Sequence, residues 1–283
     1  MNKKNQQLAI GLDIGGSKIL GLLYDQSLKK TYADYRQPII KDSLPQLIEQ
    51  IYQEINRLIS AASNLGATVT TIGLGIPGLA RRGKIITCPN LTILNGQNLV
   101  ARLTKKFPHQ KILVDNDVNC FLKAYLNKHS KLNKTTCAII ALGTGIGGAI
   151  AFNGQNITKQ VGISSEIGHM ILNHRDGTDL ENYYHQIMGY PAGQLFTAAQ
   201  NGNLVAIKKV EKFATILGVA LANLNNLISP QTIILTGGVA RYHRTYLPLI
   251  KKIIANHSIT PNSPHWIIGH DQTAAAIGAC LPN

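Results

Sequence analysis

The sequence is short of acidic residues. It has 14 Asp and Glu against 28 Lys and Arg, which gives a formal net charge of +14 over 283 residues. Such a charge suits an anionic partner, and nucleic acid is one candidate. The basic residues are spread along the chain, however, without zinc-finger spacing, a basic helix or alternating aromatic and basic residues. We therefore favour a solvated basic surface with no nucleic-acid partner, a surface that would also favour phosphate-bearing substrates.

Long hydrophobic runs and paired cysteines are also lacking. No run reaches the length of a membrane span, and the first seven residues are polar, so we expect no membrane partner and no signal peptide. The four cysteines, Cys88, Cys120, Cys137 and Cys280, form no CxxC motif. This argues against a disulfide framework or a zinc ribbon and favours reduced thiols in a cytoplasmic protein. The hydrophobic content of 45% excludes a disordered chain, and the length suits one large or two medium domains.

Polar side chains are concentrated at the point where one predicted strand ends and a predicted helix begins. Residues 111–114 read as a short buried strand, and apolar residues at three-to-four spacing follow from Val118. Two carboxylates and two amides, from Asp115 to Asn119, lie between them. In open α/β sheets ligands bind at the carboxyl ends of strands, so a carboxylate here could take a proton and the amides could hold hydroxyls. The alternative is that Asp115 or Asn116 is simply the helix N-cap.

A glycine turn follows the first predicted strand. Residues 8–14 form this strand, and the turn at 15–18 leads into a second strand, which predicts a hairpin whose N–H groups can face a phosphate. A P-loop is excluded because Ser17 and Lys18 reverse the required order and no helix follows. Asp13, at the end of the first strand, could hold a hydrated magnesium ion. An ordinary hairpin is the alternative.

A second glycine hairpin is predicted at LGTGIGG, residues 142–148. Its glycine spacing suggests a dinucleotide site, but residues 149–154 read as a strand where such a site needs a helix. Glu166 and His169 follow, and one helical turn would put them on the same side. They form either a hydroxyl-binding pair or a capping carboxylate with a structural histidine.

The remaining elements alternate between helices and strands. The sequence thus predicts two strand-rich α/β halves, each opening with a glycine hairpin. The helices are expected at residues 44–59, 99–106, 193–200, 204–228, 246–256 and 273–280, with a further helix starting near residue 179, and late strands at 231–235 and 266–268.

Seven short motifs occur in order and together resemble the ROK family (repressors, open reading frames and sugar kinases) of the actin-like ATPase superfamily. They cover nearly the whole chain: DIGGSKI at 13–19, GIPG at 75–78, CPNL at 88–91, NDVN at 116–119, LGTGIGG at 142–148, EIGH at 166–169 and LTGG at 235–238. The resemblance implies an α/β fold of two ribonuclease H-like (actin/hexokinase-like) domains with an interdomain active-site cleft. The expected limits are a small domain at 1–115 plus 271–283 and a large domain at 116–270.

The resemblance also implies an activity and its residues. The activity is ATP-dependent phosphorylation of a hexose 6-hydroxyl, of glucose or N-acetylhexosamine type, with Asp117 as the catalytic general base. The implied sugar-binding residues are Gly78, Asn90, Asn116, Asp117, Glu166, His169 and Glu181. The implied ATP- and Mg²⁺-binding residues are Asp13 (through water), Gly15, Gly16, Ser17, Lys18, Gly143, Thr144 and Gly145, with Gly237 and Gly238 facing the adenosine.

One segment departs from the family pattern. Many members carry a zinc site formed by the histidine of EIGH and three cysteines of a CxCGxxGCLE segment. Here residues 173–181 read NHRDGTDLE, without a cysteine. We therefore expect no zinc site, with hydrogen bonds or packing orienting His169 instead. Glu181 still aligns through the Leu-Glu end of the segment.

Two other functions remain as alternatives. Regulators of the family carry a helix-turn-helix domain before the DxGG hairpin, and twelve residues precede Asp13 in this sequence, too few for one. The other is a sugar-binding sensor without kinase activity, which would have no need of Asp117. The family resemblance implies a homodimer. The motifs do not choose among glucose, mannose, fructose, N-acetylglucosamine and N-acetylmannosamine.

Overall fold

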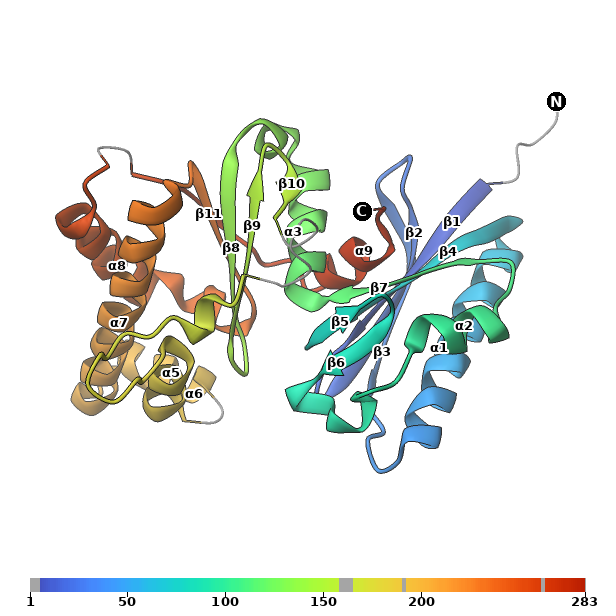
Figure 1. Ribbon diagram of the computed structural model, residues 1–283, viewed down its shortest axis with the longest axis horizontal. Helices are drawn as coiled ribbons and strands as arrows, with labels where there is room; N and C mark the ends of the chain where they lie inside the picture. Colours follow the sequence, from blue (N-terminus) through green and yellow to red (C-terminus); the bar gives the residue numbers. More distant parts are fainter. Residues whose placement is uncertain (1–5, 158–164, 190–191, 261–262, 283) are drawn as a thin grey trace. The chain divides into compact units, whose positions relative to one another are not determined.

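The computed structural model describes residues 6–157, 165–189, 192–260 and 263–282. The chain forms two compact units, one of residues 1–128 and 272–283 and the other of residues 129–271 (Figure 1). The predicted domain limits differ from these units chiefly in α3 (Asp117–Lys128), which packs on α9 (Ala274–Cys280) within the first unit. A helix that begins at the candidate base therefore belongs to the unit that supplies the strand before it.

The first unit is built on a five-stranded mixed sheet in the order β3-β2-β1-β4-β7. Strands β1, β2 and β3 form an antiparallel meander, and β4 and β7 continue parallel to β1. The strands are β1 (Gln6–Ile14), β2 (Lys18–Asp25), β3 (Lys30–Pro38), β4 (Ala67–Ile76) and β7 (Lys111–Asn116), with a small hairpin of β5 (Leu79–Arg81) and β6 (Lys84–Thr87). The further helices are α1 (Leu44–Asn64), α2 (Leu99–Lys106) and the 3-10 helix η1 (Pro89–Leu94).

The two faces of this sheet bury residues of different size. Alternate residues of β1, such as Ile10 and Leu12, pack in the cluster under α1. On the other face the backbone of α9 comes so close that Gly11 and Gly73 have no room for a Cβ atom. Small residues on β1 and β4 thus let α9 lie directly on the sheet.

Two local predictions in this unit can be checked. The helix predicted at residues 44–59 forms as α1, and the side chain of Ser43 caps it by accepting a hydrogen bond from the N–H of Gln46. The prediction that residues 111–114 form a buried strand was wrong: the strand exists, but its residues are exposed or half-buried. The reason is that β7 is the last strand of the sheet and has one neighbour.

The second unit repeats the pattern with a sheet in the order β10-β9-β8-β11-β12. Its strands are β8 (Thr136–Leu142), β9 (Ile146–Phe152), β10 (Gln155–Asn156), β11 (Thr232–Thr236) and β12 (His265–Ile268). Its helices are α5 (Leu180–Met188), α6 (Ala192–Gln200), α7 (Leu204–Ile228) and α8 (His243–His257), with the 3-10 helices η2 (Ser130–Lys134), η3 (Ile167–His169) and η4 (Gly238–Tyr242). One hydrophobic core joins this sheet to α5, α6, α7 and α8.

Two further observations concern the cysteines and the helices of the chain. All four cysteines are buried free thiols. Among the described residues, no helix combines the length and the apolar composition needed to cross a membrane.

Candidate functional site

Asp115 is fully engaged in holding the end of β7. Its Oδ1 accepts hydrogen bonds from the backbone N–H of Asn116 at 2.8 Å and from Nδ2 of Asn119 at 3.0 Å. Its Oδ2 lies 3.1 Å from Nζ of Lys123, whose side chain is 9% exposed. Both oxygens of this carboxylate therefore serve the structure.

Asn116 is the residue that caps α3. Its Oδ1 accepts bonds from the backbone N–H groups of Val118 at 2.9 Å and Asn119 at 3.2 Å, and its Nδ2 donates to the carbonyl oxygen of Gly78 at 3.1 Å. Since an amide nitrogen carries two hydrogens, it retains one donor beyond the bond to Gly78. Asp117 follows as the first residue of α3 and is half-buried. The cap and the candidate base are thus two neighbouring residues.

Predicted site residues of the first unit lie on segments that contact one another. Gly78 packs on Thr87 and Cys88 with no room for a Cβ, so the Pro-Gly corner lies against the segment that carries Asn90. A Cβ at Gly16 would lie 3.0 Å from Cβ of Asn90. The glycine hairpin, the CPNL segment and the cap of α3 therefore form one group.

The glycine turn after β1 is closed by its own backbone. The N–H of Gly15 donates to the carbonyl oxygen of Lys18 at 2.9 Å, so the N–H groups of Gly16 and Ser17 are better placed for an anion. Burial raises the pKa of Asp13 to about 6, although the positive charge of Lys18 acts to lower it. A cation at this carboxylate would restore its charged form, and Mg²⁺ in phosphate sites is typically held through one or two carboxylates. Asp13 thus fits a hydrated magnesium ion.

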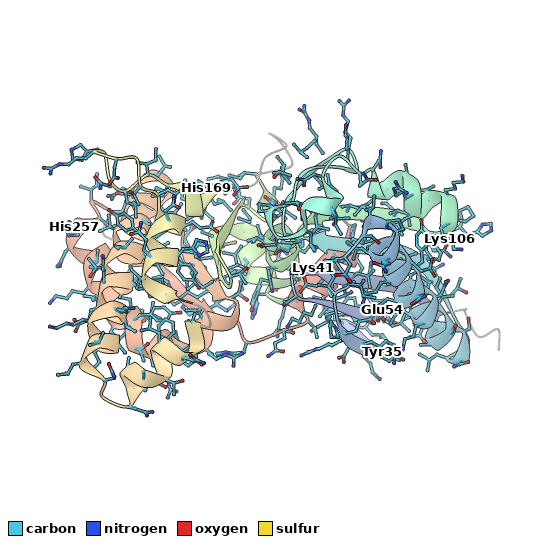
Figure 2. The ribbon with its side chains drawn as sticks, turned by 90° about the horizontal axis from the view of Figure 1, so that it is seen from below. Tyr35, Lys41, Glu54, Lys106, His169 and His257 are labelled. Carbon is cyan, nitrogen blue, oxygen red and sulfur yellow. The ribbon has the colours of Figure 1, made fainter. Side chains whose placement is uncertain are left out.

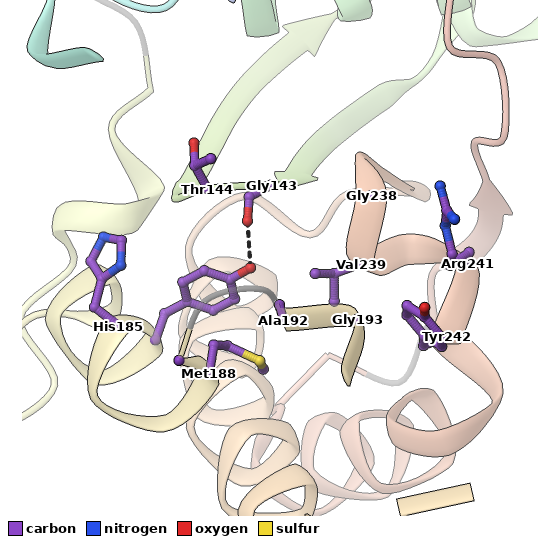
Figure 3. A pocket seen from close by; sticks show the side chains of 12 residues that line it. Gly143, Thr144, His185, Met188, Ala192, Gly193, Gly238, Val239, Arg241 and Tyr242 are labelled. Atoms are coloured by element: carbon purple, nitrogen blue, oxygen red, sulfur yellow. Dashed lines mark hydrogen bonds between the residues drawn. The ribbon is translucent and has the colours of Figure 1, made fainter. Parts of the chain in front are cut away.

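A pocket in the second unit is lined by residues of the glycine hairpin at 142–148 and of the segment around Gly238, the last residue of the LTGG motif. Its volume is about 450 Å³, within the range of small-molecule sites. Figure 3 shows Gly143 and Thr144 above it and the start of η4 beside it. The lining residues are Gly143, Thr144, Tyr184, His185, Met188, Gly189, Ala192, Gly193, Gly238, Val239, Arg241 and Tyr242. Predicted residues Gly143, Thr144 and Gly238 are among them, whereas Gly145 and Gly237 are not.

The aromatic and basic side chains of this pocket were not predicted from the sequence. The ring of Tyr242 stacks on that of Phe196, with 4.9 Å between centroids and 9° between planes. His185 and Arg241 lie on opposite sides of the pocket (Figure 3). They come from helices far apart in the chain, and no spacing in the sequence brings them together.

The second glycine hairpin is tied to α5. The hydroxyl of Tyr184 donates to the carbonyl oxygen of Gly143 at 2.6 Å, and the N–H of Gly143 donates to the carbonyl oxygen of Gly145 at 3.0 Å. The carboxylate of Glu181 fills the space beside Gly145 and Gly168, so neither has room for a Cβ. Glu181 therefore joins the hairpin to the EIGH segment.

His169 is held by a carboxylate that sequence reasoning did not single out. Its Nδ1 lies 3.0 Å from Oδ2 of Asp179, while 64% of its side chain is exposed on the second unit (Figure 2). This hydrogen bond, with the charges of Glu181, Asp179 and Glu166, raises the pKa of His169, although its partial burial acts the other way. An acidic residue at a helix start could be read from the sequence, but its contact with a histidine ten positions earlier could not.

Comparisons with known proteins agree on one family. The sequence model of the ROK family matches residues 9–281. An N-acetyl-D-glucosamine kinase of Yersinia pseudotuberculosis serotype O:1b (strain IP 31758) is 27% identical over 277 residues, covering 87% of this chain and 88% of the relative.

Solved structures agree in fold at lower identity. A ROK family glucokinase from Streptomyces griseus, in complex with glucose and AMPPNP, has a TM-score of 0.77 at 20% identity, covering 96% of this chain and 98% of the other. A ROK family transcriptional regulator, described as a homologue of the E. coli MLC protein, has a TM-score of 0.82 at 18% identity, covering 97% of this chain and 77% of the other. These neighbours confirm the predicted actin/hexokinase-like fold.

Proposed function

The chain belongs to the ROK family, and from that premise we propose that it is a sugar kinase. The proposed reaction transfers the γ-phosphoryl group of ATP to the 6-hydroxyl of a hexose of the glucose or N-acetylhexosamine type. Its relatives support this choice, since they include an N-acetyl-D-glucosamine kinase and a glucokinase. The free buried thiols support a reducing, cytoplasmic setting for the proposed enzyme.

The observation that carries the proposal is the division of tasks among residues 115–117. Asp115 is committed to Lys123 and Asn119, and Asn116 caps α3. Asp117 stands at the start of the helix at the carboxyl end of β7, where ligands of such sheets bind. We assign Asp117 the role of general base.

In the proposed reaction the sugar oxygen attacks the γ-phosphorus as its proton passes to the Asp117 carboxylate. The new O–P bond forms as the bond between the γ-phosphorus and the bridging oxygen breaks, and ADP leaves. Magnesium, when bound, neutralises charge on the phosphates, and Asp13 is the residue that would hold it. A positioned base contributes on the order of 10²–10⁴-fold to the rate.

The remaining residues bind and position the substrates. We propose that the N–H groups of Gly16, Ser17 and Thr144 contact phosphates, with Gly15, Lys18, Gly143 and Gly145 shaping or flanking the two hairpins. The adenosine would occupy the pocket beside Gly238, with Gly237 fixing the turn through its φ of +88°. The sugar hydroxyls would be held by Gly78, Asn90, Asn116, Glu166, His169 and Glu181.

A sugar-dependent regulator without kinase activity is the second candidate. The observation that favours it is the likeness to a ROK family transcriptional regulator. A regulator of this kind would bind DNA and would not depend on Asp117. A gel shift with genomic DNA fragments, with and without sugars, tests it directly.

The proposed function is tested by ADP release from ATP and magnesium with a panel of five sugars. The panel is glucose, mannose, fructose, N-acetylglucosamine and N-acetylmannosamine. We expect turnover on at least one sugar, with a 6-phosphate as the product identified by NMR. Absence of turnover on all five, together with specific DNA binding, would favour the regulator.

A further inference from the structure

The Asp179 carboxylate performs two tasks with its two oxygens. Oδ2 lies 3.0 Å from Nδ1 of His169, and Oδ1 accepts the backbone N–H of Asn182 at 2.8 Å, which caps α5. The side chain of Asp179 is 16% exposed, whereas that of His169 is 64% exposed. An exposed ring is thus anchored at one nitrogen by a largely buried carboxylate.

This contact decides which atom of the ring faces outward as an acceptor. An ionised carboxylate accepts hydrogen bonds and donates none, so Nδ1 of His169 carries the hydrogen. In the neutral ring Nε2 is then an acceptor, suited to a hydroxyl donor.

Hydrogen bonds within the segment between His169 and Asp179 hold the Asp179 carboxylate in place. The N–H of Leu180 donates to the carbonyl oxygen of Met170 at 3.0 Å, and Ile171 pairs with Asp179 in an antiparallel bridge. At the tip, Oδ1 of Asp176 accepts the N–H and the hydroxyl of Thr178, at 2.9 and 2.6 Å. The turn therefore closes through its own hydrogen bonds.

A metal ion does not fit the role of fixing this histidine. Among the described residues no group of three or more His, Cys, Asp or Glu side chains is arranged to hold one. Residues 158–164, which lie outside the described part, contain none of these four residue types. The chemistry around His169 is that of a hydrogen-bonded imidazole–carboxylate pair.

The cap of α5 by Asp179 also fixes the position of Glu181, a second predicted sugar ligand. Because Asp179 is the N-cap of α5, Glu181 occupies the first turn of the helix, with its carboxylate against Gly145 and Gly168. Oε1 of Glu181 lies 3.4 Å from Nε2 of His185, one turn along the helix. Displacing the Asp179 carboxylate would therefore disturb His169 and Glu181 together.

We propose that Asp179 is a positioning residue for the sugar, orienting His169 with Nε2 as an acceptor and fixing the start of α5. The proposal rests on the proposed kinase function, because it takes His169 and Glu181 as sugar ligands. Asp179 acts on the sugar through them and does not contact the phosphoryl donor.

Two substitutions keep the cap of α5 and change only the contact of residue 179 with His169. Asp179→Asn keeps a capping oxygen, but its amide nitrogen would donate to Nδ1 and move the ring hydrogen to Nε2. Asp179→Ser keeps a cap and is too short to reach the ring. We expect both to raise the KM for the sugar about 10- to 100-fold, the loss expected for a hydrogen bond to a charged group, with the KM for ATP changed less than about twofold. Asp176→Asn, in the same turn but away from the ring, is the control and should change neither constant more than about twofold.

The second readout is the ¹⁵N chemical shifts of the His169 ring without substrate. At a pH above the raised pKa of His169, where the ring is neutral, wild type should show the Nδ1–H tautomer and Asp179→Asn the Nε2–H tautomer. An unchanged sugar KM in both Asp179 variants, or a wild-type ring with its hydrogen on Nε2, would overturn the proposal. If wild type turned over no sugar, the kinase function would fail, while the ring shifts and sugar affinity by calorimetry would still decide whether Asp179 positions His169.

Discussion

At the scale of single residues, neighbouring side chains with the same chemistry have different tasks. Asp115 and Asp117 are two positions apart, yet the first is locked in an ion pair and the second begins a helix. The residues alone left open whether this stretch supplies a base or only a helix cap, and the family resemblance implied that Asp117 is the base. The contacts with Lys123 and Asn119 give Asp115 a structural task, and these contacts depend on how α3 lies on the end of β7.

Asp115→Asn should destabilise the protein. Lys123 is 9% exposed, so the substitution removes a negative charge that lies 3.1 Å from a largely buried ammonium group. We expect the free energy of unfolding to fall by about 2–3 kcal/mol, measured by urea denaturation. Lys128→Met, on an exposed-to-half-buried turn of the same helix, is the control. An unchanged urea midpoint for Asp115→Asn would show that the ion pair contributes nothing.

The stability of the first unit should depend on pH through the ionisation of Asp25. Hydrogen bonds from the side chains of Ser27 and Gln6 lower its pKa to about 2, and its side chain is buried. A lowered folded-state pKa stabilises the fold above the unfolded value of 3.8, and this stabilisation is lost as the pH falls toward 2. The urea midpoint should therefore drop between pH 5 and pH 2.5, and less steeply in Asp25→Asn. Equal slopes for the two proteins would contradict this account.

At the scale of elements, α5 connects two parts of the second unit. Its start carries Asp179 and Glu181, and its later turns carry Tyr184 and His185 into the pocket. The sequence predicted a helix here from the acidic first turn. It could not predict what the helix touches, because the pocket also needs η4 and α6, which lie later in the chain.

Tyr184→Phe tests the tie between α5 and the glycine hairpin. The change removes the hydroxyl that donates to the carbonyl oxygen of Gly143 at 2.6 Å. Loss of one hydrogen bond of about 1 kcal/mol should raise the KM for ATP about fivefold and leave that for the sugar within twofold. The control is Tyr183→Phe, the preceding residue of α5, which is not among the residues lining the pocket. Equal effects of the two substitutions on the KM for ATP would show that the bond to Gly143 is irrelevant to nucleotide binding.

At the scale of the whole chain, the order of elements was the most predictable feature. Both glycine hairpins form, as β1–β2 and β8–β9, because glycine turns between alternating apolar runs dictate local pairing. The long helix α7 runs from Leu204 to Ile228, which is the predicted range. The extent of each compact unit was less predictable. Helix α3 joins the first unit through its contact with α9, more than a hundred residues later in the chain.

The measurement that tests the central claim most directly compares Asp117→Asn with wild type on the sugar that gives turnover. Wild type should form the sugar 6-phosphate, and Asp117→Asn should lose 10²–10⁴-fold in kcat with sugar affinity and melting temperature nearly unchanged. This pattern would mean that Asp117 takes the proton during phosphoryl transfer. Full activity in Asp117→Asn would contradict the assignment of Asp117 as the base, and with it the account of how the NDVN segment works.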